Sequence, residues 1–368
     1  MNKFSSISIL IFVILLGLVG IEFLASKVIS TDSFNNKIHL SNDVIKFYES
    51  HYGDLHHLRG LDDTKWKLNK NPENALYNAI APFNDSQDNI LIQGDSWAAQ
   101  FETKLSRKTL LNFATENQVG IINAGASSYA PSVMTIQLRK LRQKFNIHPN
   151  HIVAIIDQTD IGDELCRYAI RRQISNSGQL IRVSPEPFES NETYKLKLFF
   201  QKQTILRSDK FALQKLVESV SLKVRHNLSK EKRRCRWREI SRPLLRGITK
   251  EEEQDFISAI NRYVDEVFLS SHVKSLHIVA HPHRNHFSNE PKNRYVLYNG
   301  TLIRSALATS KHRAKVILLD FLKRDFGLFL LNPITEPFRE GDSSSHLKDE
   351  IHGTELTPRI LEHLAKQL

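Results

Sequence analysis

Residues 89–97 read Asn-Ile-Leu-Ile-Gln-Gly-Asp-Ser-Trp, and this stretch decides the fold. The apolar run at 89–93 ends at Gly94, which is typical of a buried strand followed by a tight turn. Ser96 at the end of such a strand would expose its hydroxyl and direct its own N–H toward a bound oxyanion. The alternative is a plain helix cap, because Asp and Ser are both good N-cap residues.

Four further runs share this form, since each is short, apolar and rich in β-branched residues. They cover residues 119–124, 151–156, 276–280 and 315–319. Helical patterns separate most of them. Thr249 and Glu252 predict a capping box that opens a helix through Phe268, and residues 357–368 predict a final amphipathic helix. Strands that alternate with helices in this way predict an α/β protein, a three-layer α/β/α sandwich with a central parallel sheet.

The chain of 368 residues divides into three parts, the last of which contains an insertion. Residues 1–26 form the N-terminal segment, and residues 27–85 are a polar juxtamembrane lead-in. The α/β domain is expected over residues 86–368. The interval 166–248 interrupts its rhythm, and we interpret it as a basic, mainly helical insertion.

The N-terminal segment contains an apolar run of 19 residues from Ile7 to Ala25, in which Glu22 is the only charge. As a helix it would be about 28 Å long, close to the thickness of a bilayer core. A cleaved signal peptide is the alternative, but small residues do not stand together at −3 and −1 of either candidate site. We therefore expect an uncleaved transmembrane helix in the inner (plasma) membrane. The rest of the chain would then be periplasmic or extracellular, with Lys3 in the cytoplasm.

The net charge of +11 is concentrated in one stretch. Residues 195–246 contain 16 Lys or Arg against 4 Asp or Glu. An extracytoplasmic location argues against nucleic acid as a partner, and no nucleic-acid fold signature is present. The stretch is either a solvated basic face or a contact with anionic lipid or an acidic glycan. The two cysteines, Cys166 and Cys235, could pair outside the cytoplasm, and their number alone leaves this open.

In an open parallel sheet, ligands bind at the carboxyl ends of the strands. The residues that follow the predicted strands include Asp95, Ser96, Gly125, Asp160 and His281. The tail adds Asp349-Glu350-Ile351-His352, just before the last helix. In this spacing an Asp can orient an imidazole that takes a proton from a serine.

These blocks, in this order, resemble the SGNH (GDSL-like) hydrolases. The likeness covers Gly-Asp-Ser after the first strand, Gly after the second, an acidic loop after the third and Asp-x-x-His before the last helix. It extends from about residue 89 to the C-terminus and omits the insertion. The resemblance implies a flavodoxin-like sandwich that carries out ester hydrolysis or acyl transfer through an acyl-serine, with no cofactor and no metal.

Carried over by residue, the resemblance makes Ser96 the nucleophile and one oxyanion donor through its N–H. Gly125 is the second donor through its backbone. His352 is the general base, and Asp349 orients it. Site support is assigned to Asp95, Asn123, Gln158 and Asp160.

The third block departs from the family pattern. The family has Gly-x-Asn-Asp, whereas this chain has Asp157-Gln158-Thr159-Asp160. Thr159 stands where the family's oxyanion Asn would be. Its hydroxyl, or the amide of Gln158, would have to donate instead.

Two further features leave alternatives open. His346 can also be aligned with the family's histidine, but Asp342 is then four residues upstream, which is one too many, so the Asp349/His352 alignment is preferred. The histidine-rich loop at 281–286 could suggest a metal. No nearby Cys or carboxylate completes a ligand set, and a polar rim near the substrate is expected instead.

Three functions follow from this interpretation. The first is a serine esterase that acts on O-acyl groups, such as O-acetyl groups of an envelope or extracellular glycan, or on a small ester. The second is an O-acyltransferase to a glycan hydroxyl on the same fold. The third is a catalytically silent glycan-binding or scaffold protein.

Overall fold

A six-stranded sheet forms the centre of the chain in a computed structural model, which describes residues 3–30, 76–84, 87–183, 201–206, 208–229, 235, 237–281, 283–287, 292, 294–320, 338–339 and 346–368. The strand order is β1-β3-β2-β4-β7-β8. The strands are β1 (Asn78–Ala81), β2 (Asn89–Gly94), β3 (Gly120–Asn123), β4 (His151–Asp157), β7 (Ser275–His281) and β8 (Val316–Asp320). All neighbours pair in parallel except β1, which lies antiparallel on the β3 edge.

The five predicted strands are therefore confirmed, and their order is that of a flavodoxin-like sheet. In chain order β2, β3, β4, β7 and β8 are the first to fifth parallel strands, so the sheet reads 2-1-3-4-5. The edge strand β1 lies inside the interval that the sequence pattern assigned to a lead-in over residues 27–85. Of its four residues only Ile80 is buried, so β1 lacks the continuous buried apolar run that marks the predicted strands.

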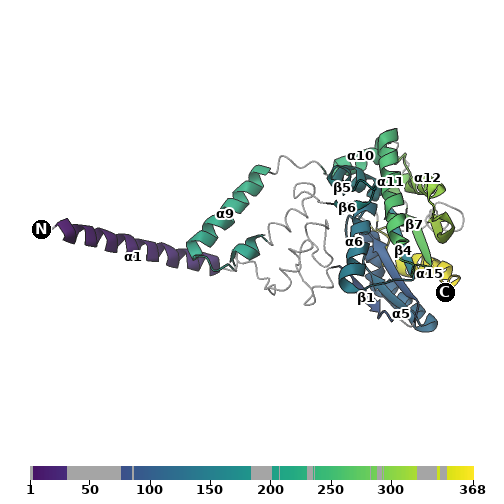
Figure 1. Cartoon of the computed structure of the whole chain (residues 1–368), viewed down its shortest axis with the longest axis horizontal. Coiled ribbons are helices and arrows are strands. Elements are labelled where there is room, and N and C mark those ends of the chain that lie inside the picture. The colour runs from purple at the N-terminus through teal and green to yellow at the C-terminus, as the bar shows by residue number, and fades with distance from the viewer. Residues whose placement is uncertain are drawn as a thin grey trace.

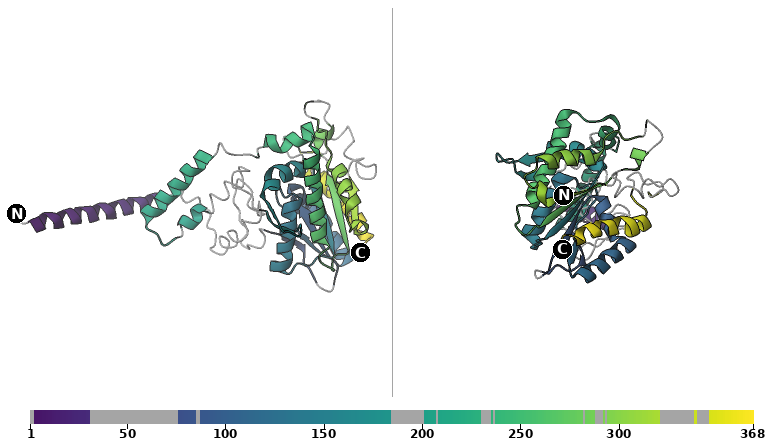
Figure 2. Two further views of the ribbon diagram at one scale, coloured as in Figure 1. Left: turned by 45° about the horizontal axis from the view of Figure 1, so that its top comes forward. Right: turned by 90° about the vertical axis from the view of Figure 1, so that its right-hand side faces the viewer.

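Helices cover both faces of the sheet, as Figures 1 and 2 show. On one face lie α6 (Pro131–Phe145), α11 (Lys250–Val267) and α12 (Asn299–Thr309). On the other lie α5 (Lys104–Asn117) and α15 (Thr357–Ala365). Strand β4 shows how one sequence serves both layers: Ile152, Ala154 and Ile156 enter the first core, and Val153 and Ile155 enter the second. The three-layer sandwich is thus observed.

The structure describes further helices and two short strands besides these layers. These are α4 (Ser96–Ala99), η2 (Gln100–Glu102), α7 (Thr159–Asp163), η3 (Glu164–Tyr168), η4 (Ala169–Arg171), β5 (Arg172–Ile174), β6 (Leu180–Val183), α9 (Ala212–Ser229), α10 (Trp237–Arg246), η6 (Arg284–Phe287), η7 (Arg313–Lys315), α14 (Asp349–Ile351) and η8 (His352–Leu356). The capping box of α11 is present as predicted, with the Thr249 side chain accepting from Glu252 N–H and the Glu252 side chain accepting from Thr249 N–H.

In its described part, the interval 166–248 contains helices and the antiparallel pair β5–β6, whose Leu180 and Val183 belong to the main core. Helix α9 packs on the N-terminal helix α1 (Lys3–Ser30) instead, and Figure 1 shows both away from the sandwich. Helix α10 returns to the sandwich and packs against α7. Most of the charge peak at 232–238 lies outside the described residues.

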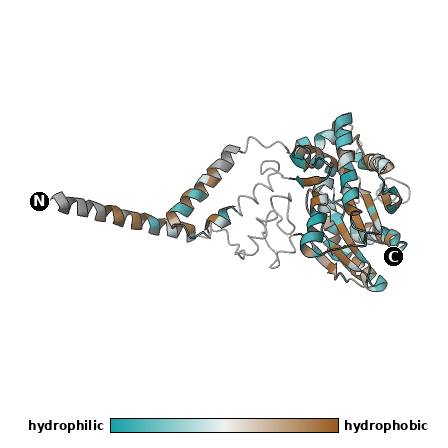
Figure 3. Cartoon of the chain, in the orientation of Figure 1, coloured by the Kyte–Doolittle hydropathy of each residue, from teal (hydrophilic) through white to brown (hydrophobic). Residues whose placement is uncertain are grey.

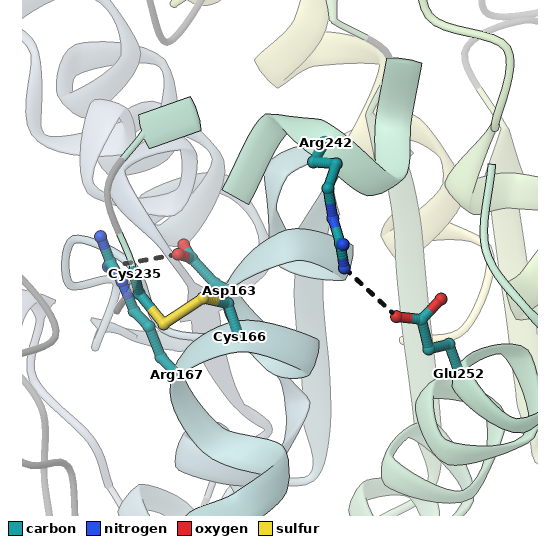
Figure 4. The surroundings of a disulfide bond; sticks show 6 residues. All are labelled: Asp163, Cys166, Arg167, Cys235, Arg242 and Glu252. Carbon is teal, nitrogen blue, oxygen red and sulfur yellow. Dashed lines mark ion pairs between the residues drawn. A yellow bond between two sulfur atoms is a disulfide. The ribbon is translucent and has the colours of Figure 1, made fainter. Parts of the chain in front are cut away.

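A disulfide joins Cys166 to Cys235 and fixes the return of the chain to the sandwich (Figure 4). Beside it, Arg167 pairs with Asp163 at 3.2 Å, and Arg242 of α10 reaches Glu252 of α11 at 3.7 Å. The contact between α7 and α10 is close at Gly162, where an added Cβ would lie 1.9 Å from the carbonyl oxygen of Ile240. The bridge settles the question that the cysteine count left open.

Helix α1 extends away from the sandwich and carries the predicted apolar run. Among the described residues it is the one helix long and apolar enough to cross a membrane, with a candidate span at Phe12–Ser30. Figure 3 shows apolar colouring along the middle of α1 and polar colouring mixed with it near the junction with α9. The helix continues beyond residue 26, the expected end of the anchor.

Candidate active site

The predicted nucleophile lies at the carboxyl end of β2, next to the end of β4. These are the first and third parallel strands, between which the chain changes direction of winding in a sheet of this order. Ser96 begins α4, and Asp95 caps that helix by accepting the N–H of Trp97 at 2.8 Å. The cap and the nucleophile are therefore adjacent residues.

Gly94 makes the turn before Ser96 possible. Its φ of +143° is a conformation that side-chain-bearing residues rarely adopt, and an added Cβ would lie 2.5 Å from the carbonyl oxygen of Ile155 in β4. Glycine is required here both by backbone conformation and by the close approach of the neighbouring strand.

A histidine of the tail contacts the nucleophile, and it is His346. Its Nε2 lies 2.8 Å from the Ser96 hydroxyl. The tail is held by a hydrogen bond from Arg339 N–H to the His346 carbonyl at 2.9 Å and by a bridge between Phe338 and Leu347. The Gln100 amide also donates to the Leu347 carbonyl at 2.9 Å, which ties the tail to the segment after α4.

His352 does not reach Ser96. It is fully buried, its Nδ1 lies 2.7 Å from the hydroxyl of Ser106 in α5, and its ring packs against Phe101 at 4.6 Å between centroids. Burial, followed by the positive charge of Arg339 and the neighbouring His346, lowers the pKa of His352 to about 3. It is therefore a neutral packing residue of the second core.

Asp349 is also separated from the role expected of it. Its carboxylate pairs with Arg339, and its side chain is 55% exposed. The chain passes from α14 into the π turn η8 at His352, so the Asp points to solvent while the His points to α5. The assignment of His352 as base and Asp349 as its orienter is thus corrected by these contacts. Asp342, the carboxylate of the competing alignment, lies outside the described residues.

The second oxyanion donor expected from the sequence already has an acceptor. Gly125 N–H donates to Asn123 Oδ1 at 2.8 Å, and the Asn123 amide donates to the Ala98 carbonyl at 2.9 Å. An added Cβ on Gly125 would lie 2.5 Å from the Ala99 nitrogen. Gly125 therefore allows the loop after β3 to pack against α4, and Asn123 supports the site by fixing that contact.

The two side chains that could replace the family's asparagine as oxyanion donors, Thr159 and Gln158, also donate to protein acceptors. The Thr159 hydroxyl donates to the Asp157 carboxylate at 2.8 Å. The Gln158 amide donates to the Leu297 carbonyl at 2.6 Å, and its oxygen accepts Asn299 N–H at 2.9 Å. Both residues hold the loop after β4 in place, and the side-chain donor of each binds a protein oxygen instead of pointing to an oxyanion site.

Three buried carboxyl groups lie beneath the nucleophile. Asp95, Asp157 and Asp160 each offer an oxygen within 4.8 Å of the others. Burial, with smaller contributions from their mutual repulsion, raises the pKa of Asp95 and Asp160 well above its usual value. Burial also raises the pKa of Asp157 to about 7. Asp95 accepts from the Ser96 hydroxyl at 3.3 Å, so this acidic cluster contacts the nucleophile directly.

Two features of the site carry little signal in the sequence. Trp97 stacks on His281, at the end of β7, with ring centroids 3.7 Å apart, and it lies 5.3 Å from the His346 ring. His281 is suggested by its place after a strand, but its contact with Trp97 is not. Ser128, after β3, has φ +59°, which no local pattern predicts for a non-glycine residue.

No protein-family model and no curated protein matches the chain. Among solved structures it is similar to LAE5, an alpha/beta hydrolase from the metagenome of Lake Arreo, with 12% identity, a TM-score of 0.40 and coverage of 76% of this chain and 96% of that one. It is also similar to the acetylxylan esterase Axe2 of Geobacillus stearothermophilus, with 11% identity, a TM-score of 0.38 and coverage of 75% and 93%.

Proposed function

We propose that this chain is a membrane-anchored serine esterase of the SGNH type, with Ser96 as nucleophile and His346 as general base. The observation that carries the proposal is the 2.8 Å separation of His346 Nε2 and Ser96 Oγ. An imidazole nitrogen within hydrogen-bond reach of a hydroxyl can take its proton as the oxygen attacks an acyl carbon. The ester C–O bond then breaks, His346 returns the proton to the departing alcohol, and an acyl-serine remains. His346 next takes a proton from water, the resulting hydroxide attacks the acyl carbon, and the carboxylic acid leaves as Ser96 regains its proton.

The oxyanion of that reaction would be held first by the Ser96 N–H. Ser96 begins α4, and the first N–H groups of a helix have no acceptor within the helix. Loss of one side-chain donor in such a site costs about 2.7–4 kcal/mol of transition-state stabilisation. Because Thr159 and Gln158 are committed elsewhere, we expect slow turnover of small esters.

The substrate class and location follow from the domain's setting. A disulfide is typical of an oxidising compartment, and α1 precedes the sandwich, so we propose that the catalytic domain is periplasmic or extracellular. Its substrate would be an O-acylated, for example O-acetylated, envelope glycan. Transfer of the acyl group to a sugar hydroxyl would make the same site an acyltransferase.

Labelling of the detergent-solubilised full chain with a fluorophosphonate probe tests the nucleophile. Wild type should be labelled, and Ser96→Ala should not. Ser132→Ala is a matched control, because Ser132 is a buried serine whose hydroxyl donates to the carboxylate of Glu164. Release of free acetate from an acetylated glycan would indicate hydrolysis, and acetate retained on an added sugar acceptor would indicate transfer.

A catalytically silent glycan-binding protein is the second candidate, and one observation favours it. The backbone donor of Gly125 and the side-chain donors of Thr159 and Gln158 all have protein acceptors. Wild type that binds glycan but takes no fluorophosphonate label would support this candidate and contradict the esterase.

A further inference from the structure

The one charge in the apolar part of α1 contacts the start of a second helix. Both carboxylate oxygens of Glu22 accept backbone N–H groups of α9: one accepts from Ala212, and the other accepts from Leu213 at 2.9 Å. The first N–H groups of a helix have no acceptor within the helix, and its N-terminus carries partial positive charge. Glu22 therefore serves as the N-terminal cap of α9, across 190 positions of sequence.

The contact between the two helices uses one side of each. On α1 the least exposed residues near the junction are Glu22, Ala25 and Ile29, spaced as one helical face. On α9 Ser219 is buried, and the partly buried residues around it are Ala212, Leu213, Lys215, Leu216, Glu218 and Leu222. A carboxylate in a membrane helix is costly unless it is paired, and this packing provides its partner.

A different side of α9 is apolar and exposed. Val217, Val220 and Val224 follow the i, i+3, i+7 spacing of a single face, and each is at least 50% exposed. Phe211, directly before the helix, is 72% exposed. We call Val217, Val220 and Val224 the α9 stripe. Figure 3 shows α9 next to the end of α1, with apolar and polar colours mixed along it.

We propose that the α9 stripe enters the headgroup–acyl boundary of the membrane that α1 spans, with Glu22 docking α9 onto α1. This inference rests on the proposed membrane anchor and extends it. Lipid is the occupant to which the surroundings point, because α1 itself leaves Phe12, Leu16 and Val19 more than half exposed and α9 packs directly on that helix.

The charge of the segment fits the same partner. Residues 201–229 contain six Lys or Arg and two Asp or Glu. Helices that lie in a membrane interface combine an apolar face with basic residues on the polar side. In this proposal α9 binds lipid chiefly through the apolar side chains of the α9 stripe. We therefore expect its contact with lipid to persist at high salt concentration.

Site-specific fluorescence of the full chain in phospholipid vesicles tests the proposal. The native disulfide leaves an introduced cysteine as the thiol to be labelled with an environment-sensitive NBD dye. We expect Val220→Cys to give blue-shifted emission that nitroxide-labelled lipid quenches and aqueous iodide does not. Glu218→Cys, two positions from Val220 and therefore on nearly the opposite side of the helix, has a side chain 37% exposed in the wild type and should give the reverse.

A third position separates this proposal from the anchor on which it rests. Leu16→Cys reports on α1 alone. Lipid quenching at Leu16 with iodide quenching at Val220 would overturn the α9 proposal and leave the anchor intact. Iodide quenching at both positions would overturn both.

Two further results bear on the occupant and on Glu22. Blue-shifted emission at Val220 that neither quencher affects, with self-quenching as protein density rises, would identify a second copy as the occupant and overturn the lipid proposal. Glu22→Ala should make the Val220 dye accessible to iodide, and Glu22→Gln, which keeps one acceptor oxygen, should do so less. Unchanged quenching in Glu22→Ala would contradict the docking role of Glu22.

Discussion

Two histidines of the tail stand six positions apart and have opposite environments. The half-buried His346 faces Ser96, and the fully buried His352 faces Ser106. A pattern such as Asp-x-x-His identifies a pair that could be catalytic, but it does not report which side of the tail faces the sheet edge. Burial and hydrogen-bond partners distinguish the two residues, and neither is readable from one sequence.

The difference gives a prediction for activity on a small acetyl ester. His346→Ala should lower kcat by about 10²–10⁴-fold, the usual contribution of a general base. Asp349→Asn should leave kcat nearly unchanged, because Asp349 pairs with Arg339 at the surface. His148→Ala is the matched control, because His148 is an exposed histidine in the loop between α6 and β4. Full activity in His346→Ala would remove His346 from the mechanism.

The acidic cluster makes stability depend on pH. The pKa of Asp157 is raised to about 7, and that of Asp160 is also raised, both mainly by burial. Between the usual Asp pKa near 4 and the raised values, the folded chain holds protons that the unfolded chain has released. The contribution of these groups is therefore complete below about pH 4 and is lost as the pH rises through 7.

Thermal unfolding at pH 5 and pH 8 measures this effect. We expect a lower Tm at pH 8 in wild type and a smaller difference in Asp160→Asn, which removes one of the repelling carboxyl groups. Asp349→Asn, which changes an exposed carboxyl, should retain the wild-type difference. An equal or larger pH effect in Asp160→Asn would show that the cluster does not hold these protons.

The helices and strands that the sequence predicts are those with a local hydrophobic pattern or capping motif. The five parallel strands and the capping box of α11 are found where the pattern places them, because each depends on local residues. The sequence pattern does not predict the pair β5–β6 or the edge strand β1, since these strands contain exposed or half-exposed positions and lack the continuous buried apolar run of the five parallel strands. The pairing of α9 with α1 was also missed, because it depends on a backbone contact between distant segments.

The disulfide between Cys166 and Cys235 gives a prediction for thermal stability. It closes a loop with a sequence separation of 69 and fixes α10 against α7, whose Thr159 and Asp160 line the site. By chain entropy such a crosslink stabilises by about 4 kcal/mol. The double variant Cys166→Ser/Cys235→Ser should unfold at a lower Tm, and reduced wild type should match it. A Tm equal to that of oxidised wild type would show that α10 is held by packing alone.

The whole molecule divides into a sandwich with its own core and a pair of helices outside it. Among the described residues, none from 3–30 or 201–229 belongs to either core cluster of the sandwich. The chemistry proposed for Ser96 and the membrane contacts proposed for α1 and α9 therefore use separate parts of the chain. The sequence indicates the first helix by its apolar run, but the connection between the two helices depends on the fold.

This division predicts how the chain responds to loss of its N-terminal helix. A variant that begins at residue 31 should keep the sandwich's Tm and its turnover of a small ester, because both cores and the Ser96–His346 contact are intact. It should leave α9 without its Glu22 cap and with two uncovered sides, so it should self-associate in the absence of lipid. Removal of residues 201–229 as well, bridged by a short Gly-Ser linker, should restore a monomer. Light scattering measures self-association, and ester turnover measures whether the sandwich stays active. If the variant that begins at residue 31 is monomeric with α9 still present, the exposed sides of α9 do not drive self-association.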